Sequence, residues 1–122
     1  MNFRLRTSSK TAEKLKSLQA STKLTPNILS RLAVSLSLKI AEEPQLELTD
    51  TSGLEFNRNT LTGEHDYVFK ALITQRMQKE ISDEEFFPDL FNAHLERGIT
   101  ILDNEYRHAG NPDRFINNLL KI

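Results

Sequence analysis

The residues best suited to bind a charged ligand are cations gathered near the start of the sequence. Residues 1–39 hold eight lysines and arginines and one acid, Glu13, a net charge of +7. Residues 40–122 hold eight bases and sixteen acids, a net charge of −8. Because a concentrated positive potential attracts phosphate groups, this division favours a surface that faces a polyanion. The alternative is that the cations only solvate two helices and are balanced by the acidic remainder within the fold.

Eight residues are candidates for contacting phosphates. They are Arg4, Arg6, Lys10, Lys14, Lys16, Lys23, Thr25 and Arg31. Arg4 and Arg6 alternate with apolar residues, so both side chains point outward from a strand, and we favour phosphate contacts over reading of bases. Thr25 precedes a proline and would cap a helix whose first amides can hold a phosphate. Lys14 and Lys16 differ by about 200° around a helix, so one of them is expected to be a bystander.

The pattern of apolar residues predicts a short strand and two helices in residues 1–41. The strand covers residues 3–7, and the first helix covers about 9–20. A second helix opens at Thr25-Pro26, carries too many apolar residues to face water, and should end at 42–44.

The pattern of apolar residues in residues 42–122 predicts a small hairpin and further helices. Leu46 and Leu48 are expected to pair with Leu54 and Phe56 around the turn at 50–53. Helices are then expected over residues 67–77, from a capping box at 82–85 to about 108, and from 111–112 through 120.

These elements predict a mainly α protein with one domain, residues 1–122. The basic part, residues 1–41, has the element order of a ribbon-helix-helix unit, a short strand plus two helices, and the acidic part, residues 42–122, is a helical extension. A lone strand of this length cannot satisfy its backbone or bury Phe3 and Leu5. The strand is therefore expected to pair with the same strand of a second chain, which implies at least a dimer.

The sequence contains no group that suggests catalysis, and no metal or cofactor is expected. Cysteine is absent, and so is a glycine-rich loop ending in lysine that would cradle a nucleotide. Two groups of residues could hold a metal. Asp83, Glu84, Glu85 and Asp89 are interpreted as residues of a helix first turn, and His65-Asp66 as an isolated pair. His94 and His108 are assigned to packing or to the surface. Tyr67 and Tyr106 lie within apolar stripes, so a tyrosine nucleophile is not expected.

Five segments carry a resemblance to a known family. They are Phe3–Arg6 with Lys10–Leu18, Thr25–Arg31, Gly53–Arg58, Leu61–Glu64 and His94–Ile99. Over roughly Met1 to Leu120 the chain resembles the DndE family of DNA sulfur modification (phosphorothioation) proteins. The resemblance implies an accessory subunit that binds duplex DNA, nicked duplex in particular, and works beside the other Dnd proteins that perform the sulfur transfer. It also implies a homotetramer, which we expect to assemble through the ribbon and the second helix.

The sequence leaves three alternatives open: a ribbon-helix-helix transcriptional repressor, a DNA-nicking subunit of the same machinery, and an assembly protein that never meets DNA. A repressor should prefer one sequence at least a thousandfold over random DNA. The sequence shows no apolar run of signal-peptide or membrane-span length, so we expect a cytoplasmic protein with no membrane partner.

Overall fold

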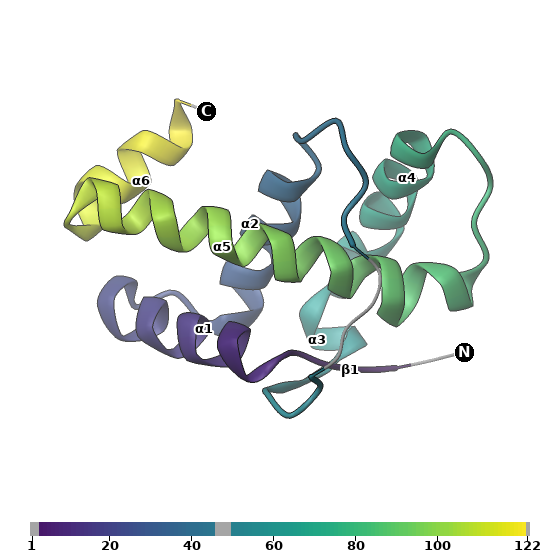
Figure 1. Ribbon diagram of the computed structural model, residues 1–122, viewed down its shortest axis with the longest axis horizontal. Coiled ribbons are helices and arrows are strands. Elements are labelled where there is room, and N and C mark those ends of the chain that lie inside the picture. The colour runs from purple at the N-terminus through teal and green to yellow at the C-terminus, as the bar shows by residue number, and fades with distance from the viewer. Residues whose placement is uncertain (1–2, 46–49, 122) are drawn as a thin grey trace.

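The long helix α5 (Phe91–Ala109) lies at the centre of the fold in the computed structural model, which describes residues 3–45 and 50–121. Packed against it are α1 (Ser9–Thr22), α2 (Pro26–Ser37) and α6 (Pro112–Leu120). Figure 1 shows α5 running across the molecule, with α2 crossing behind it and α1 below it. The mainly α fold predicted from the sequence is confirmed.

The backbones of α2 and α5 touch where they cross. A Cβ atom added to Gly98 of α5 would lie 1.8 Å from the carbonyl oxygen of Ala33 in α2 and 2.3 Å from its carbonyl carbon. Ala33 and the adjacent Val34 are completely buried. Only glycine leaves room for this approach, so Gly98 sets the distance between α2 and α5.

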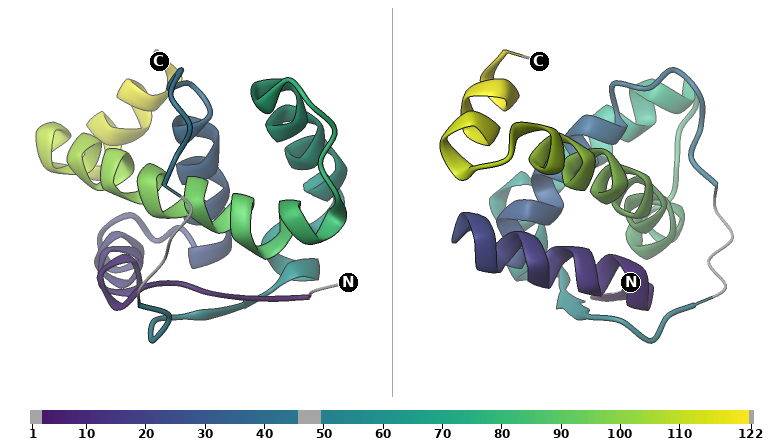
Figure 2. Two further views of the ribbon diagram at one scale, coloured as in Figure 1. Left: turned by 45° about the vertical axis from the view of Figure 1, so that its right-hand side comes forward. Right: turned by 60° about the vertical axis from the view of Figure 1, so that its left-hand side comes forward.

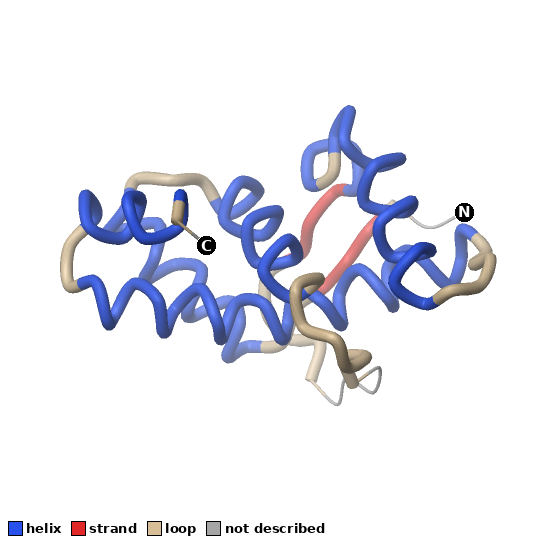
Figure 3. The backbone as a smooth tube through the Cα atoms, turned by 90° about the horizontal axis from the view of Figure 1, so that it is seen from above, coloured by secondary structure: helices blue, strands red, loops and turns tan. Residues whose placement is uncertain are grey.

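The predicted N-terminal strand exists, but its partner lies in the same chain. Strand β1 (Arg4–Arg6) pairs antiparallel with β2 (Glu55–Asn57), as Figure 3 shows in red. Leu5 lies opposite Phe56, and both are buried, whereas Phe3 is 49% exposed. A second chain is therefore not needed to cover Leu5. The need to bury Leu5 therefore does not support a ribbon formed between two chains, and that ribbon stays a prediction.

The hairpin proposed around residues 50–53 is only partly testable, because its first strand falls in residues 46–49, outside the described part of the chain. The second strand is present as β2, and its strand partner within the described residues is β1. Alternation of apolar and polar residues predicts which face of a strand is buried, but it does not say which strand lies alongside.

Helix starts follow the capping residues that the sequence indicates. The side chains of Ser8, Thr25 and Asn111 each accept a hydrogen bond from an amide three residues on, at the starts of α1, α2 and α6. The predicted end of α2 at 42–44 is wrong, because α2 ends at Ser37. There the guanidinium of Arg97 donates to the Ser37 carbonyl oxygen at 2.8 Å, and a partner for this last carbonyl stabilises the helix end.

Three short elements connect β2 to the capping box. They are α3 (Arg58–Leu61), the 3-10 turn η1 (Gly63–His65) and α4 (Asp66–Met77). The predicted capping box is confirmed, since the Ser82 amide donates to Glu85 at 3.0 Å and the Glu85 amide donates to the Ser82 hydroxyl at 3.1 Å. It opens the irregular turn η2 (Glu85–Leu90), in which extended Phe87 delays the start of α5.

Aromatic rings fasten α4 and η2 to the start of α5. Phe69 of α4 and Phe86 of η2 both meet the Phe91 ring edge to face, with centroids 5.4 Å and 6.1 Å apart. Tyr67 does not belong to this cluster: it is 80% exposed, so its assignment to an apolar stripe was wrong. The two views of Figure 2 show α4 standing to one side of α5, away from α1 and α6.

We predict that Gly98→Ala destabilises the protein by more than about 2 kcal/mol, although alanine is the better helix former. The added methyl group collides with the backbone of Ala33, which cannot rotate away, so α2 and α5 must separate. Urea unfolding followed by circular dichroism measures the loss. Asn104→Ala, at an exposed position of the same helix, is the control and should change stability by less than about 0.5 kcal/mol. Equal stability of the two variants would contradict the close-contact account.

Candidate nucleic-acid interface

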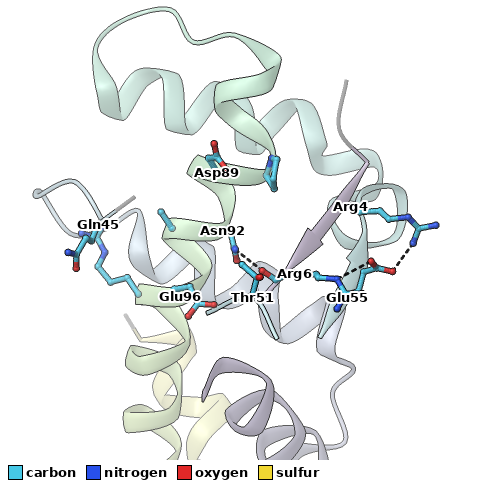
Figure 4. A pocket seen from close by; sticks show the side chains of 11 residues that line it. Arg4, Arg6, Gln45, Thr51, Glu55, Asp89, Asn92 and Glu96 are labelled. Atoms are coloured by element: carbon cyan, nitrogen blue, oxygen red, sulfur yellow. Dashed lines mark hydrogen bonds and ion pairs between the residues drawn. The ribbon is translucent and has the colours of Figure 1, made fainter. Parts of the chain in front are cut away.

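The outward face of the two-stranded sheet carries two arginines with a glutamate between them. Arg4 Nη1 lies 2.9 Å from Glu55 Oε2, and Arg6 Nε lies 3.4 Å from Glu55 Oε1. The Arg4 and Arg6 side chains are 66% and 56% exposed. Figure 4 shows both arginines reaching toward Glu55. The outward direction expected for the Arg4 and Arg6 side chains is therefore observed. The acid between them, Glu55, lies outside residues 1–41 and was not part of that expectation.

Arg4 and Arg6 also line an open cavity of about 920 Å³ between the sheet and the start of α5. Asn92 of α5 lies on the far side, and its Nδ2 donates to the Arg6 carbonyl oxygen at 3.0 Å. Asp89 and Glu96 lie in the same lining, as Figure 4 shows. The lining holds three arginines and three acids, since Arg97 and Glu55 also belong to it, so the cavity as a whole has no excess of positive side chains.

Two carboxylates already occupy the N-terminus of α1. Glu96 accepts hydrogen bonds from the Ser8 amide at 3.0 Å, the Ser8 hydroxyl at 2.7 Å and the Thr11 hydroxyl at 2.8 Å. Asp50 accepts from the Ser9 amide at 2.8 Å, and hydrogen bonds from Ser52 and Ser9 hold the pKa of Asp50 well below its usual range. These carboxylates take the place that a phosphate could occupy at this helix end, and they fix β1 and α1 to the rest of the fold.

The lysines of the basic part divide between two flanks of α1 and the turn after it. Lys10, Lys16 and Lys23 are exposed, whereas Lys14 is half-buried and its Nζ lies 3.3 Å from Thr100 Oγ1 of α5. Lys10 and Lys14 are four positions apart and share a flank, and Lys16 lies on the other flank. Strand β1 and helix α1 follow each other along one side of the molecule in Figure 1, so the elements that carry Arg4, Arg6 and the α1 lysines are continuous, although the lysines divide between two flanks of the helix.

Thr25 and Arg31 serve the fold directly. The Thr25 hydroxyl caps α2 by accepting from the Ile28 amide at 3.4 Å. Arg31 Nη1 donates to the carbonyl oxygens of Thr60 at 3.2 Å and Leu61 at 2.8 Å, which ties α2 to α3. Of the eight candidates, five therefore have side-chain contacts within the chain, and Arg4 and Arg6 are two that share one partner, Glu55.

Comparison with known proteins identifies the family. The family model described as DNA sulphur modification protein DndE matches residues 4–110. The chain belongs to the DndE family. This membership places it among the proteins of DNA sulphur modification and confirms the family suggested by the sequence segments.

Two crystal structures of DndE proteins share the fold. DndE from Escherichia coli B7A, involved in DNA phosphorothioation modification, has a TM-score of 0.67 and 24% sequence identity, and the match covers 81% of this chain and 96% of that chain. A DndE mutant with glycine-to-lysine substitutions, involved in DNA phosphorothioation, has a TM-score of 0.65 and 25% identity, and the match covers 85% and 99%. A comparison with curated proteins finds no match.

Arg58 of this DndE-family chain is a buried cation that sequence reasoning missed. Its guanidinium makes paired hydrogen bonds of 2.8–2.9 Å to Asp66 and to Asp83, and it lies over the rings of Phe86 and Phe87. Asp83 is therefore an ion-pair partner and not simply a first-turn residue, and Asp66 is not part of an isolated pair with its neighbour. No local spacing links Arg58 to these acids, which are 8 and 25 positions away.

The charges in this cluster stabilise one another. Hydrogen bonds to Asp83 and Asp66 raise the pKa of Arg58, and hydrogen bonds from Arg58 lower the pKa of Asp83. Burial alone would raise the pKa of Asp66, but hydrogen bonds from Arg58 and Thr62 outweigh it and lower that pKa. The two acids that seemed able to hold a metal thus bind a cation of the chain itself. In the described residues, no group of three or more histidines and acids is arranged to hold a metal ion.

A second buried polar cluster joins α5 to the end of α2. His94 is completely buried, and its Nδ1 lies 2.9 Å from the Ser37 hydroxyl, which also accepts from Arg97 Nε at 2.8 Å. Burial lowers the pKa of His94 to about 4, and the nearby charges of Arg97 and Arg76 act in the same direction. The packing role expected for His94 is observed.

No helix in the described parts of the chain is long and apolar enough to span a membrane.

We predict that Arg58→Ala destabilises the protein by about 3 kcal/mol, because it leaves two partly buried carboxylates without their cation. The free energy of unfolding from urea titration measures this. Arg107→Ala is the matched control: Arg107 pairs with Asp103 at 3.0 Å, but its side chain is 75% exposed. The control should cost less than about 0.5 kcal/mol. Similar losses in both variants would mean that the Arg58 cluster is no stronger than a surface pair.

We predict that His94 makes the protein less stable as the pH falls from about 6.5 toward 4. The unfolded chain binds a proton at His94 near pH 6.5, whereas the folded chain binds it only near pH 4, so stability is lost by at most about 1.4 kcal/mol per pH unit in that window. His94→Gln removes this group, so the stability advantage of the wild type should shrink by about 2 kcal/mol between pH 7.5 and pH 5. Unfolding titrations at several pH values test this, with His108→Gln as the exposed control. Parallel pH profiles for wild type and His94→Gln would refute it.

Proposed function

We propose that this DndE-family protein binds duplex DNA, nicked duplex in particular, as an accessory subunit of the DNA phosphorothioation machinery. The observation that carries the proposal is the placement of Arg4 and Arg6. Both side chains are more than half exposed on the outward face of one small sheet, and α1 with its lysines continues from the same strand. A run of exposed cations on rigid elements suits the repeating charge of a nucleic-acid backbone.

The contacts are proposed to be mainly with phosphates. Arg4 and Arg6 point outward from a strand of only three residues, and Lys10, Lys16 and Lys23 are exposed on α1 and the turn after it. Side chains spread along an edge of the molecule in this way can follow a backbone, whereas reading of bases needs several side chains converging on one groove. The proposal therefore favours a general or nick-directed binder over a sequence-specific repressor.

Sulfur transfer is proposed to belong to partner proteins. The sequence has no cysteine to carry a persulfide and no loop of the type that holds a nucleotide, so this subunit would recruit, hold or position DNA for other Dnd proteins. The two similar crystal structures are of DndE proteins involved in DNA phosphorothioation, which supports this setting. A non-enzymatic role is part of the same proposal.

We propose a homo-oligomer, with a tetramer as the expected state, because repetition of the basic region would multiply its phosphate contacts. Helix α2 hides Leu29, Ala33 and Val34 against the rest of the same chain, whereas Ile28 is 38% exposed and is left for a subunit contact to cover. The outer edge of β1 is open to another strand only in part, because the Arg6 carbonyl oxygen already accepts from Asn92. Sedimentation at several protein concentrations distinguishes the monomer, dimer and tetramer.

We predict that replacing Arg4, Arg6, Lys10 and Lys23 together with glutamine weakens binding to duplex DNA at least about tenfold at 100 mM salt. Fluorescence anisotropy with intact, nicked and single-stranded DNA at several salt concentrations measures this. The slope of log affinity against log salt should become less steep by about 0.9 for each phosphate that the variant no longer neutralises. Arg31 is left unchanged because it holds α3.

The matched control replaces four exposed cations of the acidic part with glutamine; they are Lys79, Arg107, Arg114 and Lys121. It changes the net charge by the same amount and should leave most of the affinity and the salt slope in place. Equal loss in the two variants would reject the basic region as the DNA-binding surface. A preference of a thousandfold or more for one DNA sequence would favour the repressor instead.

A further inference from the structure

Glu55 lies where a phosphate would have to bind if Arg4 and Arg6 contact DNA. Its two carboxylate oxygens are divided between the arginines, one 2.9 Å from Arg4 Nη1 and the other 3.4 Å from Arg6 Nε. Figure 4 shows the carboxylate placed between the two guanidinium groups. A carboxylate and a phosphate use the same kind of acceptor oxygen toward the same N–H donors, so the two groups compete for one position.

The strand register produces this arrangement. Arg6 pairs directly with Glu55, and Arg4 pairs with Asn57, so all four side chains point to the outward face of the sheet, opposite Leu5 and Phe56. The outward face thus has two positive charges and one negative charge. An intervening negative charge weakens the potential that attracts a polyanion.

The contacts made by Glu55 are of a kind that a phosphate can replace. The side chain of Glu55 is 37% exposed and those of both arginines are more than half exposed, so water and salt screen the pairs and they add little to folding stability. Each guanidinium has five donors, and Glu55 engages one nitrogen on each, so a phosphate that takes this position has to displace only one contact per arginine.

We propose that Glu55 is an internal competitor for phosphate that lowers the affinity of this surface for DNA. Binding of a phosphodiester requires Glu55 to leave the arginines. The contacts with DNA must supply the free energy of this displacement, so a duplex that makes only weak contacts is not bound. The proposal rests on the proposed function, since it assigns a residue that tunes the same surface. It makes Glu55 a positioning and specificity residue and gives it no part in sulfur chemistry.

The experiment compares Glu55→Gln with the wild type in binding to a fluorescent duplex of about 30 base pairs, intact or nicked, from 50 to 200 mM salt. Removing the competing charge should tighten binding about three- to tenfold at 100 mM salt and steepen the salt slope by about 0.9, the effect of one additional neutralised phosphate. Glu80→Gln, at an exposed position after α4, changes the net charge equally and should leave both quantities near wild-type values. Glu55→Thr, which keeps a strand-forming residue, should reproduce the tightening if the glutamine variant folds poorly.

A second background tests whether Glu55 acts through the arginines. In a protein carrying Arg4→Gln and Arg6→Gln, replacing Glu55 should no longer tighten binding, because the groups that it competes for are gone. Tightening that persists in this background would overturn the proposal.

The failure of this proposal is distinguishable from failure of the proposed function. Binding by the wild type with no gain in either Glu55 variant overturns the competitor role alone. Absence of binding by the wild type and by both Glu55 variants at 50 mM salt overturns the DNA-binding function and the competitor role together. Binding that appears only when Glu55 is replaced supports both.

Discussion

The contact between the backbones of α2 and α5 at Gly98 is the constraint on which the remaining structure depends. It places α5 close enough to α2 for side chains on either side of the contact to reach the elements of the basic part. One turn before Gly98, His94 reaches Ser37 at the end of α2, and two positions before it Glu96 reaches the start of α1. A wider helix spacing would break these hydrogen bonds together, so the position of the basic part against α5 depends on this glycine.

Charge is divided along the sequence, but folding brings the two signs together. The acidic part supplies Glu55 to the arginines of β1, and it supplies Glu96 and Asp50 to the start of α1. Arg58 shows the same principle inside the core, where it neutralises two acids. The net charges of +7 and −8 therefore overstate the potential at the surface. The cations available to a polyanion are those whose acidic partners are absent or easily displaced. For this reason the contacts of Arg4 and Arg6 with Glu55 matter more than the number of arginines.

Helix starts that depend on neighbouring residues were predicted well from the sequence, whereas contacts between segments far apart in the sequence were not. The caps at Ser8, Thr25 and Asn111 fixed helix starts, because each depends on residues within one turn. The capping box at Ser82 also formed, but extended Phe87 after it moved the start of α5 to Phe91. The end of α2 was missed because its last carbonyl is satisfied by Arg97, sixty positions later. The Arg58 cluster and the partner of β1 were missed for the same reason, since a single sequence carries no sign of contacts between distant segments. Arg4 and Arg6 were placed on the correct face, but Glu55 between them could not be foreseen.

The segment His94–Ile99, part of the resemblance to the DndE family, positions the candidate interface without forming it. Each polar side chain in it contacts a part of the basic unit: His94 and Arg97 bind Ser37 of α2, and Glu96 binds the residues that begin α1. Gly98 then admits α2 itself. These residues are buried or half-buried, so substitutions here should disturb the proposed DNA binding only by moving the cations, with a loss of stability in proportion. Substitutions at exposed Arg4, Arg6 or Glu55 should change affinity and its salt dependence while stability stays near that of the wild type, and this contrast separates the residues that build the surface from those that use it.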